Sequence, residues 1–318
     1  MRGSVVCLGE ILVDCFVTAV AQEEAQSLPG GAPANVACGL ARLGVPTEFI
    51  GAVGDDRWGH ALKQLLADLN VGSLGVQQLA LPTRQVQVLL NEQGDRSFAG
   101  FGEATLPDDF ADAHLQATAI EPALFAQVKY LVLGTISLAY EETQAAVQHA
   151  IALTRQQQGR VMVDINWRPM FWPQPATAPT RIHALLLQAD LLKLSAEEAI
   201  WLFETRDPRA IAAQFPNLDG VLVTVGAAGC RYWLGGHVGE LPGFTVDVED
   251  TTGAGDAFVA GFLTQLYRHG HHSLQTAETA RAAVRFASAV GALTTTRAGA
   301  IAAQPTPKEV EAFLFLHR

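Results

Sequence analysis

A glycine-rich stretch followed by an acidic residue stands near the end of the chain, in the sequence DTTGAGDAF at residues 250–258. Gly253, Ala254 and Gly255 are small, and an apolar segment typical of a helix follows them. The first turn of a helix carries unpaired main-chain N–H groups, which together with the helix dipole favour an anion. Asp256 falls in that turn, beside the expected phosphate. The amides could then hold the charge of a transferring phosphoryl group while Asp256 takes a proton from the attacking hydroxyl.

Taken alone, this stretch has a simpler explanation. An acidic residue at the beginning of a helix interacts favourably with the helix dipole whether or not the protein is an enzyme. The stretch also lacks the GK[ST] ending of a P-loop and the GxGxxG spacing of a dinucleotide-binding loop. A second motif is therefore needed to support the chemistry.

That second motif is GGAPANVACGLARLG at residues 30–44. Gly30 and Gly31 permit close approach of a ligand to the backbone, and a helix is expected to begin near Pro33. Asn35 in its first turn offers an amide that both donates and accepts hydrogen bonds, which suits a polyhydroxy ligand. An ordinary junction between a loop and a helix would have the same pattern.

Short apolar runs that alternate with longer helical patterns must position these motifs. This alternation predicts an α/β fold with a mostly parallel sheet, and the nearly continuous Val, Leu and Ile runs predict strands covered on both faces. We expect strands at 5–8, 48–53, 130–133, 161–165, 191–194 and 221–225, and helices at 56–70, 141–157, 180–189, 197–203, 253–269 and 278–292.

The segment 84–101 has a different pattern. Valines alternate with glutamines on one side of residues 91–95, which are rich in turn-forming residues, so a half-exposed hairpin is expected. Together with residues 11–18 it could form a small lid sheet that excludes water from a site, or it could be an ordinary hairpin packed on the core. We therefore expect one domain over residues 1–318, with lid strands drawn from about 11–18 and 84–101.

Charge and hydropathy limit the partners. The chain has 21 Lys and Arg against 32 Asp and Glu, a net charge of −11, and no basic cluster, which argues against nucleic acid. Glu10 and Asp14 directly follow the apolar residues 4–8, so an export signal is not expected. The longest uncharged stretch, 25–41, contains prolines and glycines and does not suit a membrane helix. We expect a cytoplasmic protein with neither nucleic-acid nor membrane partners.

Taken together, the two motifs resemble the two signatures of the PfkB, or ribokinase-like, carbohydrate kinases. They occur in the family's order, and the resemblance extends over nearly the whole chain, including residues 9–14 and 224–229. The resemblance implies a ribokinase-like fold, with a central mostly parallel sheet flanked by helices and a small β-sheet lid. It also implies ATP and Mg²⁺ as cofactors, a sugar as substrate, and a homodimer joined through the lid as one possible assembly.

The resemblance also implies roles for the residues that match its motif positions. Asp256 matches the catalytic base, and the three small residues before it match the anion hole. Ser195 and Glu198 match an N-x-x-E motif, in which Ser195 replaces the usual asparagine and Glu198 would act through water on Mg²⁺. The matching sugar contacts are Asp14, Gly30, Gly31 and Asn35; the matching nucleotide contacts are Thr224, Gly226 and Gly229; a K⁺ site would involve Asp250, Thr251 and Gly299.

Two positively charged residues, Lys193 and Arg168, each allow two interpretations. Lys193, at the end of a predicted strand, could reach the nucleotide phosphates or could simply be exposed. Arg168 lies in DINWRP, a stretch that resembles fructokinases and 2-keto-3-deoxygluconate kinases. It could bind the substrate or form a surface salt bridge.

The identity of the sugar depends on the lid. Deoxygluconate kinases typically have an FxYxR-like run there, whereas residues 98–102 are FAGFG and supply neither Tyr nor Arg. Without a second cation a sugar acid would be poorly neutralised, so we favour a neutral ketose, most simply fructose. The alternatives are a kinase acting on 2-keto-3-deoxygluconate, ribose or a nucleoside, and a non-catalytic sugar sensor. The complete DTTGAGD run argues against the sensor, which needs no base.

Overall fold

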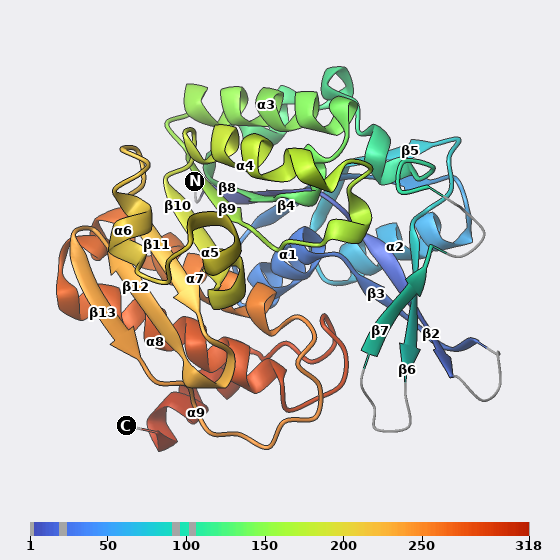
Figure 1. Cartoon of the computed structure of the whole chain (residues 1–318). Helices are drawn as coiled ribbons and strands as arrows, with labels where there is room; N and C mark the ends of the chain where they lie inside the picture. The colour runs from blue at the N-terminus through green and yellow to red at the C-terminus, as the bar shows by residue number, and fades with distance from the viewer. Residues whose placement is uncertain (1–2, 19–23, 91–95, 102–105, 318) are drawn as a thin grey trace.

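The computed structural model describes residues 3–18, 24–90, 96–101 and 106–317. Within these ranges a nine-stranded sheet runs through the centre of the molecule (Figure 1). All its neighbouring strands are parallel except the last two pairs at one edge, β11 with β12 and β12 with β13. The order is β13 (His237–Leu241), β12 (Cys230–Leu234), β11 (Gly220–Thr224), β10 (Leu191–Ser195), β9 (Arg160–Asp164), β8 (Val128–Gly134), β1 (Ser4–Leu8), β4 (Thr47–Gly54) and β5 (Gly72–Leu79).

The strands that the sequence predicts are the buried ones, and the strands it misses are mostly at the edges. The six apolar runs coincide with β1, β4, β8, β9, β10 and β11 to within three residues at either end. The missed strands β5, β12 and β13 include both edges of the sheet. Edge strands are partly exposed, and β13 alternates between exposed and half-buried residues, so no continuous apolar run marks it.

Helices cover both faces of the main sheet, as the continuous apolar strands predict. In β1, Val5 and Cys7 join one core with α1, α2, α7 and α8, while Val6 and Leu8 join the other with α3, α4, α5 and α6. The predicted helices are present with shifts of up to three residues, whereas α6 and α9 were not predicted. The bounds are α1 (Ala32–Arg42), α2 (Arg57–Asp68), α3 (Glu141–Gln156), α4 (Ala178–Leu186), α5 (Ala196–Phe203), α6 (Pro208–Ala212), α7 (Ala254–His269), α8 (Ala277–Thr294) and α9 (Pro307–Leu316).

Over the described ranges, none of the helices has both the length and the apolar character needed to cross a bilayer.

A second, four-stranded sheet, which we call the lid sheet, projects from one end of the main sheet (Figure 1). Its order is β3 (Glu24–Gly30), β2 (Leu12–Thr18), β6 (Gln85–Leu90) and β7 (Arg96–Gly100), with β2 and β6 parallel. The strand β3 was not predicted, because EAQSLPG has no alternation and ends in Pro-Gly. The predicted turn at 91–95 and Gly102 lie outside the described residues.

Candidate active site

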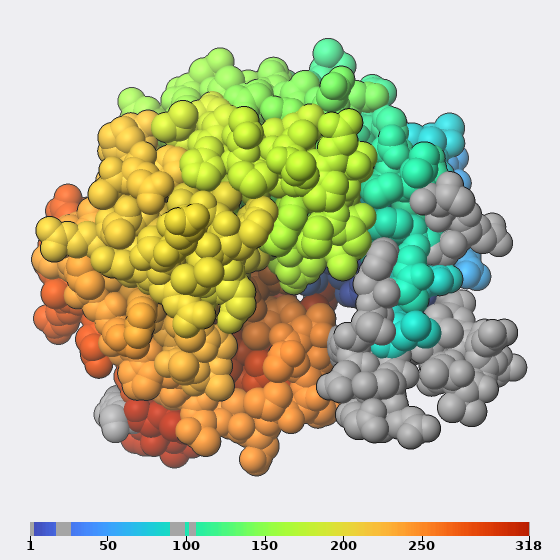
Figure 2. All heavy atoms as spheres, in the orientation of Figure 1, coloured from blue at the N-terminus to red at the C-terminus, as the bar shows by residue number. Residues whose placement is uncertain are grey.

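A pocket of about 770 Å³ lies where the carboxyl ends of the central strands face the lid sheet. It appears in Figure 2 as a hollow beside the orange and yellow-green segments. Glu10 follows β1, Asn166 follows β9, Ser195 ends β10 and Thr224 ends β11, and all four line the pocket. Ligands bind at this edge of open α/β sheets, because the loops that follow the strands converge there.

One face of the lid sheet forms the opposite wall of the pocket. Leu12, Asp14 and Phe16 of β2 and Val86 and Val88 of β6 line it. These residues follow the two-residue period of a strand, so the intervening residues point to the other face. The alternation of valine and glutamine at 85–88 thus marks the pocket-facing side of β6.

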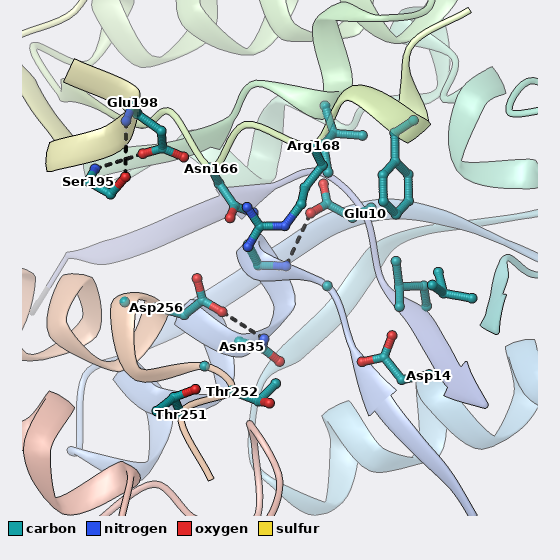
Figure 3. A pocket seen from close by; sticks show the side chains of 18 of the residues that line it. Glu10, Asp14, Asn35, Asn166, Arg168, Ser195, Glu198, Thr251, Thr252 and Asp256 are labelled. Carbon is teal, nitrogen blue, oxygen red and sulfur yellow. Dashed lines mark hydrogen bonds between the residues drawn. The ribbon is translucent and has the colours of Figure 1, made fainter. Parts of the chain in front are cut away.

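The two sequence motifs meet at Asp256. Asn35, in the first turn of α1, donates a hydrogen bond from Nδ2 to Asp256 Oδ2 at 2.8 Å, across 221 residues of sequence (Figure 3). Gln304 steadies this turn by donating to the main-chain oxygen of Asn35 at 2.9 Å. Burial raises the pKa of the Asp256 carboxyl, while the Asn35 amide and the Lys193 ammonium oppose the rise. A carboxylate held on one oxygen, with its pKa shifted toward neutrality, suits general-base chemistry.

The N-terminus of α7 has the geometry of an anion site. Gly253 is the N-cap residue, with a left-handed φ of 75°. A Cβ atom at Gly253 would lie 2.7 Å from the Cβ of Ala300, so a larger residue would displace the loop. Gly253 and Gly255 line the pocket, whereas Ala254 is not among its lining residues. The main-chain N of Ala254 donates to Thr251 O at 3.3 Å, and the small residues at 253 and 255 leave room for a phosphate to approach the start of the helix.

Lys193 reaches the same turn from β10. Its ammonium pairs with both oxygens of Asp164 at 3.0 Å, and it lies 3.0 Å from where a Cβ of Gly255 would be. Lys193 is buried yet lines the pocket, so the alternative of a freely exposed lysine is wrong. Burial lowers the pKa of Lys193, but the carboxylates of Asp164, Glu198 and Asp256 outweigh it and raise this pKa. The side chain therefore carries a positive charge beside the anion site.

Glu198 lines the pocket and also holds its wall in place. Its Oε2 accepts a hydrogen bond from Ser195 N, and its Oε1 accepts one from Trp167 N, both at 2.7 Å. The first contact completes a capping box at the start of α5. The second fixes the loop after β9, where Asn166 has an unusual positive φ of 41°. Figure 3 shows Arg168 of this loop reaching into the pocket, so it is placed to contact a ligand.

The glycine pair before α1 shapes the end of the pocket next to β2. Gly31 has a φ of 105°, and a Cβ there would lie 2.5 Å from the main-chain oxygen of Glu10. A Cβ at Gly30 would lie 2.7 Å from Asp14 Oδ2. Asp14 and Gly31 line the pocket, whereas Gly30 lies behind Asp14 and is not among the lining residues.

The remaining predicted contacts separate into lining and supporting residues. Thr224, Gly226 and Thr251 line the pocket. Gly229 does not; it is buried and closes the turn after β11 by accepting a hydrogen bond from Val225 N at 2.8 Å.

The predicted cation loop is held together by Asp250. Its Oδ2 accepts a hydrogen bond from Gly299 N and its Oδ1 one from Thr252 N, both at 2.9 Å. Neither Asp250 nor Gly299 lines the pocket. The hydrogen bond between them nevertheless joins the segment before α7 to the segment around Gly299. A buried carboxylate supplies the kind of oxygen ligand that a hard cation prefers. Within the described ranges, no group of three or more His, Cys, Asp or Glu side chains could hold a metal ion.

Sequence reasoning missed part of the site. Glu10 and Asn166 were seen only within longer motifs, and Ile136, Met170 and Phe171 were not singled out, although all five line the pocket. The signal for Glu10 and Asn166 was available, because each closely follows a predicted parallel strand. The apolar residues give no such signal, because a pocket wall and a core have the same composition.

The geometry can be set beside known proteins. The family model described as pfkB family carbohydrate kinase matches residues 2–307. The chain is 38% identical over 316 residues to "Probable fructokinase-6, chloroplastic" of Arabidopsis thaliana, covering 96% of this chain and 81% of that protein. A structure of fructokinase with bound ATP from Xylella fastidiosa has a TM-score of 0.92 and 30% identity, covering 100% of this chain and 99% of that one. The fructokinase of Vibrio cholerae bound to fructose, ADP and calcium has a TM-score of 0.85 and 31% identity, covering 98% and 99%.

Proposed function

We propose that this chain, which belongs to the pfkB family of carbohydrate kinases, transfers the γ-phosphoryl group of ATP to a hydroxyl group of fructose. The observation that carries the proposal is the Asn35–Asp256 hydrogen bond, which joins the two motifs inside one pocket. The names of the relatives support fructose, and the ATP and fructose in their structures support this pair of substrates.

Asp256 is proposed as the general base. Asn35 fixes one of its oxygens, so the carboxylate has a defined orientation toward the hydroxyl that it deprotonates. The N–H groups at the start of α7 and the Lys193 ammonium lie next to this carboxylate and would stabilise the charge on the transferring phosphoryl group. Proton removal and charge stabilisation are thus supplied from one helix turn and one strand end.

Two cations, Mg²⁺ and K⁺, are proposed to assist the phosphoryl transfer. Mg²⁺ bound with ATP neutralises charge on the phosphate oxygens. Glu198 is proposed to hold it through water, because its oxygens keep lone pairs while accepting main-chain N–H groups. Asp250, Thr251 and Gly299 are proposed to hold a K⁺ ion on the side of α7 where the two loops join.

The charge of the pocket supports a neutral sugar. Among the lining residues that the structure describes, five carry carboxyl groups and two carry a positive charge. One of the two, Lys193, is already paired with Asp164, which leaves Arg168. A sugar acid would bring a further negative charge into this environment, so fructose is favoured over 2-keto-3-deoxygluconate.

A substrate panel tests the proposal. ADP release from ATP is measured with fructose, 2-keto-3-deoxygluconate, ribose and a nucleoside, with a sugar-free reaction as the control for background hydrolysis. We expect the highest kcat/KM with fructose. A higher kcat/KM for another member would move the assignment to that substrate, and sugar binding without ADP release would favour a sensor.

We also propose that the enzyme works in the cytoplasm as a homodimer joined through the lid sheet. In the described part of that sheet, β3 and β7 are the outer strands, and each pairs on one side only. Such edges pair readily with another chain. Light scattering coupled to size-exclusion chromatography would give twice the monomer mass, and a monomer mass would contradict the assembly.

A further inference from the structure

Gln304 is buried beside the two sequence motifs without lining the pocket. It lies in the segment that leads from α8 to α9, its side chain is only 1% exposed, and it is not among the lining residues. Its Nε2 donates two hydrogen bonds, one to the main-chain oxygen of Asn35 at 2.9 Å and one to that of Ala300 at 3.0 Å. One amide nitrogen therefore joins the first turn of α1 to the segment that follows α8.

Both partners of this amide lie next to the residues proposed for the phosphoryl transfer. Asn35 donates from its side chain to Asp256 Oδ2 at 2.8 Å (Figure 3). Ala300 packs against the start of α7, since a Cβ at Gly253 would lie 2.7 Å from the Cβ of Ala300. The Gln304 amide thus connects the residue that holds the base to the loop that packs against the anion site.

A contribution to stability alone does not explain an amide at this position. Gln304 Oε1 is buried and has no hydrogen-bond partner among the residues that the structure describes. Such an oxygen is costly, and an apolar side chain of the same length would fill the space without that cost. The space is tight, because a Cβ at Gly39, one turn after Asn35, would overlap the same oxygen. What an amide adds here is therefore its donor group.

We infer that Gln304 is a positioning residue whose donor group fixes the main chain of Asn35 relative to the start of α7, so that the Asn35 amide meets the Asp256 carboxylate beside the transferring phosphoryl group. The inference rests on the proposed sugar kinase activity and adds a residue to it. Gln304 lies outside the pocket and acts through Asn35. Because the rate of transfer depends steeply on the alignment of the reacting groups, a loosened Asn35 should reduce turnover more than substrate binding.

Steady-state kinetics of Gln304→Met test the role. Methionine has nearly the same length and volume but no donor, so kcat with the preferred sugar of the substrate panel should fall about 10-fold. The KM values for the sugar and for ATP should stay within about threefold of wild type, because Gln304 does not line the pocket. Thr264→Val is the matched control, since Thr264 is fully buried in α7 and its Oγ1 donates to Ala260 O at 2.7 Å. This control should keep kcat within about twofold of wild type.

A double-mutant cycle shows whether the effect passes through Asn35. Asn35→Ala removes the side-chain hydrogen bond to Asp256 but keeps the main-chain oxygen that Gln304 contacts. In this background Gln304→Met should change kcat by no more than about twofold, because the link to the carboxylate is already absent. A merely structural role would lower kcat by about 10-fold in both backgrounds, since independent effects multiply.

The pH profile supplies a readout that a loss of stability would not move. The Asn35 amide opposes the rise that burial causes in the pKa of Asp256. If Gln304→Met loosens this amide, that pKa rises further, and the acid limb of the kcat/KM profile for the sugar moves to higher pH. The side chains before and after the substitution are both neutral, so the other groups that face this carboxyl keep their charges. These charged or titratable groups are Lys193, Arg168, Glu198, Asp164 and Glu10.

The outcomes separate the inference from the function on which it rests. Sugar-dependent ADP release by the wild type, with kcat of Gln304→Met within about twofold of it, overturns the inference alone. Equal falls in kcat in the two backgrounds, or an acid limb that does not move, overturn it as well. If Gln304→Met does not fold, Gln304→Asn, whose shorter side chain withdraws the amide from Asn35 O, takes its place with the same expectations. Absence of ADP release with every sugar overturns the proposed function and the inference with it.

Discussion

Two buried ion pairs lie near the pocket, and the fold uses them differently. Lys193 and Asp164 are 3.0 Å apart at the end of β10, and the ammonium lines the pocket beside the start of α7. Arg84 and Asp112 are 2.7 Å apart just before β6, and Arg84 is completely enclosed. Arg84 also donates to Pro107 O at 2.8 Å and to Tyr140 Oη at 3.2 Å. The first pair faces a ligand space and the second faces only protein.

The packing around each cation explains this difference. The guanidinium of Arg84 lies over four aromatic rings, with its Cζ 4.5 to 5.7 Å from their centroids; they belong to Phe101, Phe110, Tyr140 and Phe171. A planar, weakly hydrated guanidinium suits such an enclosure, whereas a compact ammonium suits phosphate. The main-chain oxygen of Arg84 also accepts from Val13 N, which ties the lid strands β6 and β2 together. Burial of a cation therefore does not identify a functional residue; what the cation faces does.

The largest expected effect is at Asp256, which lies with Lys193 beside the expected phosphate. Asp256→Asn keeps an acceptor for Asn35 but removes the base, so kcat should fall about 10³- to 10⁴-fold. The thermal unfolding temperature should stay close to that of the wild type, because the replacement has the same shape. Turnover near the wild-type level in this variant would remove Asp256 from the role of base.

The next effect is expected at the enclosed pair and concerns stability. Arg84→Met leaves the buried Asp112 carboxylate without its cation, so the free energy of unfolding should fall by about 3 to 5 kcal/mol. The folded variant should keep kcat within about threefold, because Arg84 does not line the pocket. Urea unfolding measures the first quantity. Arg84→Met/Asp112→Leu should recover much of the stability, and a variant that is stable but inactive would break the comparison.

Lys193→Met tests whether the Lys193–Asp164 pair serves ATP binding, in contrast to the structural pair of Arg84. Loss of the ammonium beside the anion site should raise the KM for ATP about 10- to 100-fold, the usual range for a charge-assisted hydrogen bond. Lys193→Met/Asp164→Asn should regain stability without regaining ATP affinity. Lys129→Met removes a cation outside the pocket and serves as the control. An unchanged KM for ATP would make the Lys193 pair structural, like that of Arg84.

The smallest effect is expected for an exposed pair, Arg297 with Glu309. Hydrogen bonds from Thr306 and Arg297 lower the pKa of Glu309 to about 2. Because the folded pKa lies below the unfolded value of 4.5, the stabilisation is present above pH 4.5 and is lost as the pH falls toward 2. Glu309→Gln should lower the free energy of unfolding by about 1 kcal/mol at neutral pH, since solvent screens this site. Urea unfolding at several pH values measures it, and a difference that grows toward low pH would contradict it.

Part of the fold could be predicted because its signals are local. The runs that form β1, β8, β10 and β11 are nearly continuous in apolar residues, interrupted inside the strands by Lys129 and Lys193, and such strands are expected to be covered on both faces. The strands β3 and β13 gave no comparable signal, because their stability comes from pairing with neighbours. The division between predicted and missed elements thus follows burial.

The sequence by itself determined the chemical components of the site: a glycine-rich turn that begins α7 with Asp256 in its first turn, and a glycine pair that begins α1 with Asn35. Both helix starts depend on residues that are close in sequence, because helix starts and glycine conformations are local properties. Only the tertiary structure decided that Asn35 meets Asp256 and that Lys193 faces a ligand space while Arg84 does not. These relations join residues distant in sequence, and their surroundings are fixed only when the two sheets and their helices pack together.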